Sequence, residues 1–137
     1  MGIFDRMGKV ISSNMNALFD RLEDPKKLVE LDLDEAADQL KKGRQELVAA
    51  VGSEKQLKKK VDDLDAQIAL WEKRAELAVK AQDEPLAREA LKQKRRVQDE
   101  RERAERARLE QRDIALRMKE ELDRAEVRLS DWRMRKG

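Results

Sequence analysis

The side chains that usually carry enzyme chemistry are either missing from this chain or occur in patterns that do not form a site. The sequence has 137 residues with no cysteine and no histidine, which removes thiolate and imidazole chemistry. Adjacent carboxylates such as Asp62 and Asp63 are abundant, and on an exposed helix such groups serve solubility. No glycine-rich phosphate loop, metal-ligand cluster or pair of nucleophile and base occurs. We therefore expect no catalytic residue, no metal site and no cofactor.

Two short basic runs are the only candidates for binding nucleic acid. They are Lys58-Lys59-Lys60 and Lys94-Arg95-Arg96, and acidic residues follow each of them closely. No aromatic residues are interleaved with them to stack on bases. The 32 basic and 30 acidic residues nearly cancel, so the whole chain has no strong field that attracts phosphate. We expect no nucleic-acid partner.

The composition is that of long helices and not that of a compact domain. Charged residues make up 45% of the chain and aromatic residues 3%, with five glycines and two prolines. No apolar run approaches the roughly 20 residues that a membrane-spanning helix needs. The first residues lack the apolar region and cleavage site of a secretory signal, so the default expectation is a cytoplasmic protein.

Residues 24–130 carry apolar residues at alternating steps of three and four. In the first arm this series runs for about seven heptads with breaks at Gly43 and Glu54, which predicts a coiled coil. We predict an all-α protein in which an amphipathic helix (residues 1–23) precedes a long antiparallel coiled-coil hairpin (residues 24–137). The first arm of the hairpin would cover about 24–82 and the second about 84–137. Asp24 and Pro25 provide a helix start and a bend between the two parts.

The connection between the arms lies near Pro85, where Asp83 or Glu84 can cap a new helix. A hairpin tip is the simplest interpretation, and one continuous helix kinked at Pro85 is the alternative. A fold about residues 82–83 places large residues opposite small ones, as in Leu40 with Ala125. It also places Trp71 opposite Lys94, which allows the ring to stack on the lysine stem or to form a cation–π contact. The predicted seam residues are Leu33, Leu40, Leu47, Val61, Ile68, Trp71, Val97, Met118, Leu122, Leu129 and Trp132.

The middle of the second arm is densely charged even on the side that should face the first arm. Its seam positions include Lys94, Arg101 and Arg108. One interpretation is an exposed helix stabilised by ion pairs within itself. The other is a surface on which acidic and basic residues mesh with another subunit.

The N-terminal segment is strongly amphipathic at helical spacing and has basic residues beside its apolar side. Such a helix suits the interface of a membrane, with its apolar side among the acyl chains and its basic groups near anionic lipids. The alternative is that the apolar side packs against the hairpin or against another subunit. The candidate membrane-binding residues are Ile3, Phe4, Met7, Val10, Ile11, Met15, Leu18 and Phe19.

Several stretches together resemble the phage shock protein A family, which includes the plastid vesicle-inducing protein and is related to the ESCRT-III proteins. The stretches lie at the start of the chain, at the bend and around the predicted tip. They are Met1-Gly2-Ile3-Phe4, Glu23-Asp24-Pro25-x-Lys27-Leu28-Val29, Trp71 with Ala75-Glu76-Leu77-Ala78, and Leu86-Ala87-Arg88-x-Ala90-Leu91. The resemblance covers almost the whole chain.

The resemblance implies a membrane-stress scaffold on the inner face of the cytoplasmic membrane. Such a protein binds anionic lipids through its N-terminal helix and self-assembles into filaments by stacking hairpins, which stabilises or remodels the bilayer. The alternative that the family offers is a soluble hairpin that inhibits an AAA+ transcriptional activator. Members normally continue into further helices that help assembly.

The resemblance also draws attention to Arg44 and Glu126, which occupy positions resembling residues discussed for nucleotide hydrolysis in some relatives. The register of the hairpin places the two residues near the same level. We favour an ion pair between helices or subunits over a catalytic role.

Overall fold

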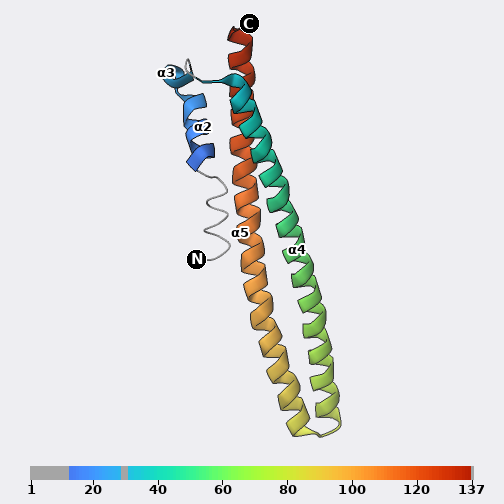
Figure 1. Cartoon of the computed structure of the whole chain (residues 1–137). Coiled ribbons are helices and arrows are strands. Elements are labelled where there is room, and N and C mark those ends of the chain that lie inside the picture. The colour runs from blue at the N-terminus through green and yellow to red at the C-terminus, as the bar shows by residue number, and fades with distance from the viewer. Residues whose placement is uncertain (1–12, 29–30, 137) are drawn as a thin grey trace. The chain divides into compact units, whose positions relative to one another are not determined.

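The computed structural model of the chain describes residues 13–28 and 31–136, and these residues contain helices but no strand. The helices are α2 (Ser13–Glu23), α3 (Pro25–Leu28), α4 (Leu33–Lys80) and α5 (Glu84–Lys136) (Figure 1). The long helices α4 and α5 pack against each other as an antiparallel hairpin, joined by a short connection. The predicted all-α hairpin is therefore confirmed.

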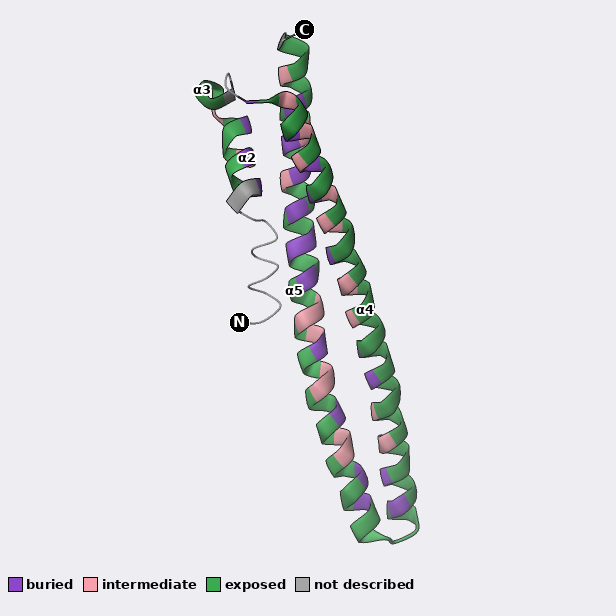
Figure 2. Cartoon of the chain, viewed as in Figure 1, coloured by how far each residue is buried: buried purple, intermediate pink, exposed green. Residues whose placement is uncertain are grey.

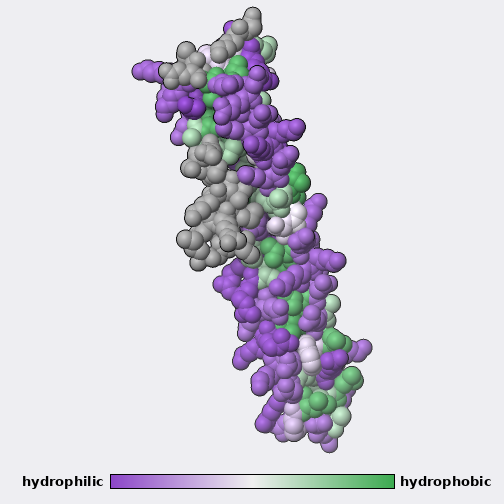
Figure 3. All heavy atoms as spheres, viewed as in Figure 1, coloured by the Kyte–Doolittle hydropathy of each residue, from purple (hydrophilic) through white to green (hydrophobic). Residues whose placement is uncertain are grey.

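The described residues divide into two compact units, and both contain part of the hairpin. One unit is Ser53–Leu109, and the other joins the described residues up to Gly52 to those from Glu110 onward. Buried residues lie on the facing sides of α4 and α5 in each unit (Figure 2). Hydrophilic residues cover most of the face seen in Figure 3, as expected for helices that bury only one side.

In the unit Ser53–Leu109, the seam joins large and small apolar side chains from the two arms. Val61, Leu64, Val97 and Ala104 form one buried cluster, and Val97 has no exposed surface. Ile68 and Trp71 are partly buried and pack against this cluster. Nearer the connection only alanines are buried, so the two helices approach closely there. These alanines are Ala75, Ala78, Ala87 and Ala90.

The other unit buries the rest of the predicted seam. Leu40, Leu122, Ala125 and Leu129 belong to one buried cluster, against which Leu33 is packed. Leu47 is partly buried between this cluster and a second one that contains Met118. Trp132 is also partly buried.

The first arm begins later than the sequence predicted. A helix was expected to run from Asp24, but α3 ends at Leu28 and α4 begins at Leu33. Asp32 caps α4, because its Oδ1 accepts hydrogen bonds from the backbone N–H groups of Asp34 at 3.0 Å and Glu35 at 3.3 Å. Asp24 caps only the four-residue helix α3, through the N–H of Lys26 at 3.0 Å. The prediction assigned the cap of the arm to the earlier aspartate.

The connection between α4 and α5 is a Schellman turn followed directly by a cap. The N–H of Asp83 bonds to the carbonyl of Ala78 at 2.9 Å, and that of Gln82 bonds to the carbonyl of Val79 at 3.0 Å. Gln82 has a φ of 57°, the left-handed conformation that this turn requires. Asp83 then accepts the N–H of Leu86 at 3.1 Å, so the next helix begins at once, with Pro85 in its first turn.

We expect Gln82→Gly to stabilise the hairpin by about 0.5–1 kcal/mol, because glycine adopts a positive φ without the steric cost of a side chain. The greater freedom of glycine in the unfolded chain offsets part of this gain. Urea denaturation followed by circular dichroism measures the change. Gln82→Ala is the matched control and should show no such gain. Equal stability of the two variants would contradict the strain assigned to this turn.

Candidate functional site

The membrane-binding face predicted for the N-terminal segment is described only in its second half. Ile3, Phe4, Met7, Val10 and Ile11 lie outside the described residues. Met15, Leu18 and Phe19 lie in α2, an amphipathic helix whose residues Asn16, Ala17, Asp20 and Arg21 are exposed. The structure therefore shows an amphipathic helix at the end of the segment.

The apolar side of α2 packs on the hairpin. Met15, Leu18 and Leu22 are 8%, 3% and 1% exposed, and Phe19 is partly buried. They belong to the same buried cluster as Ala36 and Leu40 of α4 and Leu122, Ala125 and Leu129 of α5. The alternative considered for this face, packing on the hairpin, is thus the arrangement that the structure shows for Met15 and Leu18.

Gly43 makes room for this packing. A Cβ atom placed on Gly43 would collide with Met15 Cε and would lie 2.7 Å from Leu122 Cδ2. By contrast, a Cβ on Gly52 would meet nothing within 4 Å. The absence of a side chain at Gly43 therefore lets α2, α4 and α5 meet at one point.

A cleft lies between α2 and the start of α4. It has a volume of about 230 Å³, and its lining includes Leu18, Arg21, Leu31, Asp32 and Glu35. Leu31 is buried in the cluster that holds α2, whereas Asp32 and Glu35 are exposed. Along this edge the contact of α2 with the hairpin is therefore open to solvent.

Arg44 joins the two arms through a set of charged hydrogen bonds in the same unit. Its Nε donates to Glu126 Oε1 at 2.7 Å and its Nη2 donates to Glu126 Oε2 at 2.8 Å, a two-point contact. Nη2 also donates to Asp123 Oδ1 at 2.5 Å. Lys119 donates to the other oxygen of Asp123 at 2.8 Å. The ion pair that we favoured for Arg44 and Glu126 is thus an ion pair within one hairpin.

These contacts hold the carboxylates in their charged forms. The hydrogen bond from Arg44 lowers the pKa of Glu126, and bonds from Lys119 and then Arg44 lower the pKa of Asp123. The same carboxylates raise the pKa of Arg44. With its donors committed to two carboxylates, Arg44 is held as a structural cross-link of the hairpin.

Glu46, two residues after Arg44 on α4, is in a different environment. Its Oε2 is buried and has no hydrogen-bond partner in the structure. Burial raises the pKa of Glu46, because the charged carboxylate loses hydration without gaining a cation. Glu46 therefore opposes folding at neutral pH, whereas Glu126 supports it.

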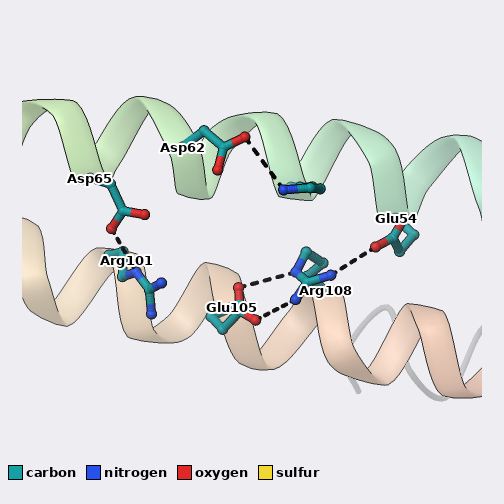
Figure 4. A network of polar contacts seen from close by, with 7 residues as sticks. Glu54, Asp62, Asp65, Arg101, Glu105 and Arg108 are labelled. Carbon is teal, nitrogen blue, oxygen red and sulfur yellow. Dashed lines mark hydrogen bonds and ion pairs between the residues drawn. The ribbon is translucent and has the colours of Figure 1, made fainter.

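The unit Ser53–Leu109 contains a second network of ion pairs across the seam (Figure 4). Arg108 donates from Nη1 to Glu54 Oε1 at 3.0 Å across the hairpin, and from Nη2 to Glu105 Oε1 at 2.6 Å on its own helix. Arg101 donates to Asp65 at 2.9 Å. The bond from Arg108 lowers the pKa of Glu105.

The third basic residue on this side, Lys94, is also paired with an acidic residue of the first arm, and this pair takes the charged end that a cation–π contact with Trp71 would use. Lys94 Nζ lies 3.0 Å from Glu72. The ring of Trp71 is instead contacted by Arg74 of its own helix, whose Cζ lies 4.7 Å from the ring centroid. All three basic seam residues are therefore paired with acids of the first arm, which neither interpretation of this region had predicted.

Metal chemistry and membrane crossing find no support in the part of the chain that the structure describes. Residues 13–28 and 31–136 contain no group of three side chains suited to hold a metal ion. Over the same residues, no helix combines the length and the apolar character needed to cross a bilayer.

Comparison with known proteins gives a match over nearly the whole chain. The sequence profile of the PspA/IM30 family matches residues 2–137. The membrane-associated protein Vipp1 of Nostoc punctiforme is 38% identical over 99 residues, which are 72% of this chain and 38% of that protein.

Two further relatives match along the whole of this sequence or nearly so. Vipp1 of Synechocystis sp. is 30% identical over 137 residues, covering 100% of this chain and 51% of that protein. The phage shock protein A homolog of Deinococcus radiodurans is 26% identical over 136 residues, covering 99% and 61%. The chain spans about half the length of these relatives.

We expect Arg44→Gln to destabilise the protein at pH 7 by about 1 kcal/mol, a value reduced for the partial exposure of the pair. Because the pKa of Glu126 is lowered in the folded state, this stabilisation exists above the usual carboxyl pKa of about 4. It is lost as the pH falls through the lowered value. The free energies of unfolding of the parent and the variant should therefore approach each other as the pH is lowered from about 7 to about 3. Denaturation curves recorded across this range measure both.

Arg117→Gln is the matched control for this measurement, because the ion pair that Arg117 makes with a described residue joins it to the exposed Asp113 four residues earlier on the same helix. It should cost no more than about 0.5 kcal/mol. An equal loss in both variants would contradict the cross-linking role of Arg44.

Proposed function

Since the chain belongs to the PspA/IM30 family, we propose that it is a peripheral protein of the inner face of the cytoplasmic membrane. Its N-terminal segment, residues 1–23, inserts its apolar side between anionic lipids. The observation that carries this proposal is the amphipathic helix α2, which ends a segment that is amphipathic along its whole length. The relatives named membrane-associated protein support the same role.

Basic residues at the end of α2 and in α3 are placed to assist the binding of anionic lipids. Arg21, Lys26 and Lys27 are exposed, and Lys26 and Lys27 follow Pro25 directly. Basic groups beside an interfacial helix are attracted to the negative surface of anionic bilayers. The apolar side would supply insertion, and these residues would favour the anionic surface.

The second part of the proposal is that the protein acts as a scaffold that self-associates through its hairpins and supports the bilayer under stress. In the part of α5 that follows Glu110, three large apolar side chains are exposed. They are Leu116, Val127 and Met134, with exposed fractions of 52%, 61% and 77%. They are separated by eleven and seven residues, spacings that return to the same side of a helix. A second hairpin could bury this stripe. The role is structural and needs no catalytic residue.

The membrane role is tested with Phe4→Glu in the full chain. Burying a charge in the acyl region is unfavourable, so we expect the variant to lose flotation with vesicles of phosphatidylcholine and phosphatidylglycerol. Helicity should be retained, because the hairpin supplies most of it. Asn16→Glu adds the same charge at an exposed position of α2 and is the matched control.

Flotation of Phe4→Glu equal to that of the parent would contradict insertion by this helix. If the parent itself does not float, the chain is better explained as a soluble hairpin that acts on a protein partner, such as an AAA+ activator.

Self-association is tested by replacing two residues of the exposed stripe, in the double variant Leu116→Glu/Val127→Glu. We expect its sedimentation to show smaller species than the parent at equal concentration, because the charges oppose burial of the stripe. The control is a double variant at exposed polar positions of the same helix, Arg117→Glu/Arg128→Glu. An unchanged distribution of species in the stripe variant would contradict this assignment.

A further inference from the structure

The apolar side of α2 has two possible partners, and it cannot contact both at once. Lipid insertion requires this side to face the acyl chains. In the structure, Leu22 is 1% exposed, Leu18 3% and Met15 8%, all against the hairpin. Membrane binding by the whole segment, which rests on the proposed function above, therefore requires α2 to leave the hairpin.

The surface that α2 covers is apolar and is formed by both arms of the hairpin; we call it the groove. Ala36 and Ala125 provide small side chains where α4 and α5 meet, and Leu40, Leu122 and Leu129 provide larger ones. Gly43 adds a notch that receives the end of the Met15 side chain. The fit depends on that position, because a Cβ atom there would meet the ends of both the Met15 and the Leu122 side chains, which would have to shift.

The contact is apolar, so a lipid phase can replace it. Burial of apolar surface is non-directional and proportional to area, and the acyl boundary offers α2 an equivalent environment. The open cleft beside Leu18 gives solvent access to one edge of the contact. On the other side, Phe19 is only partly buried and Leu22 lies beside Glu121 and Arg128 of α5. When α2 moves from the groove to lipid, Leu40, Leu122 and Leu129 lose their contact with it, whereas the two other clusters of the hairpin contain no residue of α2.

We infer that the groove around Gly43 is an autoinhibitory site, which holds the lipid-inserting side of α2 against the hairpin and competes with the membrane for it. The affinity of the chain for lipid is then reduced by the fraction of molecules in which α2 is docked. Weakening the groove should raise membrane binding, although none of the altered residues touches lipid.

The chain has no cysteine, so a single pair of introduced cysteines can fix α2 in place. The variant Met15→Cys/Gly43→Cys places one thiol on α2 and the other at the notch, where the Met15 side chain now ends. Reduced and oxidised samples of this full-length variant are floated with phosphatidylcholine–phosphatidylglycerol vesicles. Each single-cysteine variant, treated with the same oxidant, is the control.

We expect the oxidised protein to bind at least about tenfold more weakly than the reduced form of the same variant, with binding restored by reductant. The single variant Met15→Cys measures separately what the loss of Met15 from the lipid-inserting side costs. Equal flotation of the two forms overturns the inference and leaves the proposed function standing. Absence of flotation in the parent and the reduced form overturns the proposed function and the inference with it. A disulfide that joins two chains overturns the inference, because α2 is then not held on its own hairpin. If no disulfide forms, the Gly43→Gln and Gly52→Gln variants below decide the question.

A second pair of variants tests the opposite direction. Gly43→Gln should displace Met15 and increase flotation at limiting lipid, by at least about threefold if most molecules are docked. Gly52→Gln is the matched control, because its position has open space, and it should leave flotation unchanged. Circular dichroism verifies that both variants retain the hairpin. Unchanged or reduced flotation of a folded Gly43→Gln variant overturns the inference.

Discussion

The burial of one narrow apolar seam between α4 and α5 is the interaction on which the rest of the structure depends. Each helix buries only one side, and the composition offers too few apolar residues for a broader core. Val97 and Leu122 are almost completely buried, and alanines oppose larger residues along much of the seam. Close packing of this kind supplies dispersion and hydrophobic free energy only where the two helices remain in register.

Charged residues reinforce that register where apolar residues are scarce. Arg108 with Glu54 and Arg101 with Asp65 connect the arms in one unit, and Arg44 with Glu126 connects them in the other. Two of these contacts are partly exposed, so each contributes modestly to the free energy of folding. These pairs matter more for fixing the register of the two helices than for the free energy of folding, because a shift of register by one heptad would separate every pair at once.

The helix α2 uses apolar surface that the seam leaves partly uncovered. It completes the burial of Leu40, Leu122 and Leu129, and Gly43 allows its close approach. The same physical property, an apolar side on a helix, would serve for lipid insertion. A segment of this kind links the stability of the hairpin to the membrane, because apolar surface of α2 that becomes buried in lipid is no longer buried against the groove.

The sequence alone determined the all-α class and the place near Pro85 where the long helical region is interrupted, because heptad spacing and a capped proline are local signals. The structure decided for a hairpin over a continuous helix kinked at Pro85. The sequence also placed Arg44 and Glu126 at the same level of such a hairpin, since register follows from the connection. Only the tertiary structure decided that α4 begins after Asp32, that the ammonium group of Lys94 pairs with Glu72, and that Arg74 lies over the ring of Trp71. It also decided that Met15 and Leu18 lie against the hairpin. Periodicity shows which side of a helix avoids water, whereas the identity of its partner depends on where other segments of the chain lie in space.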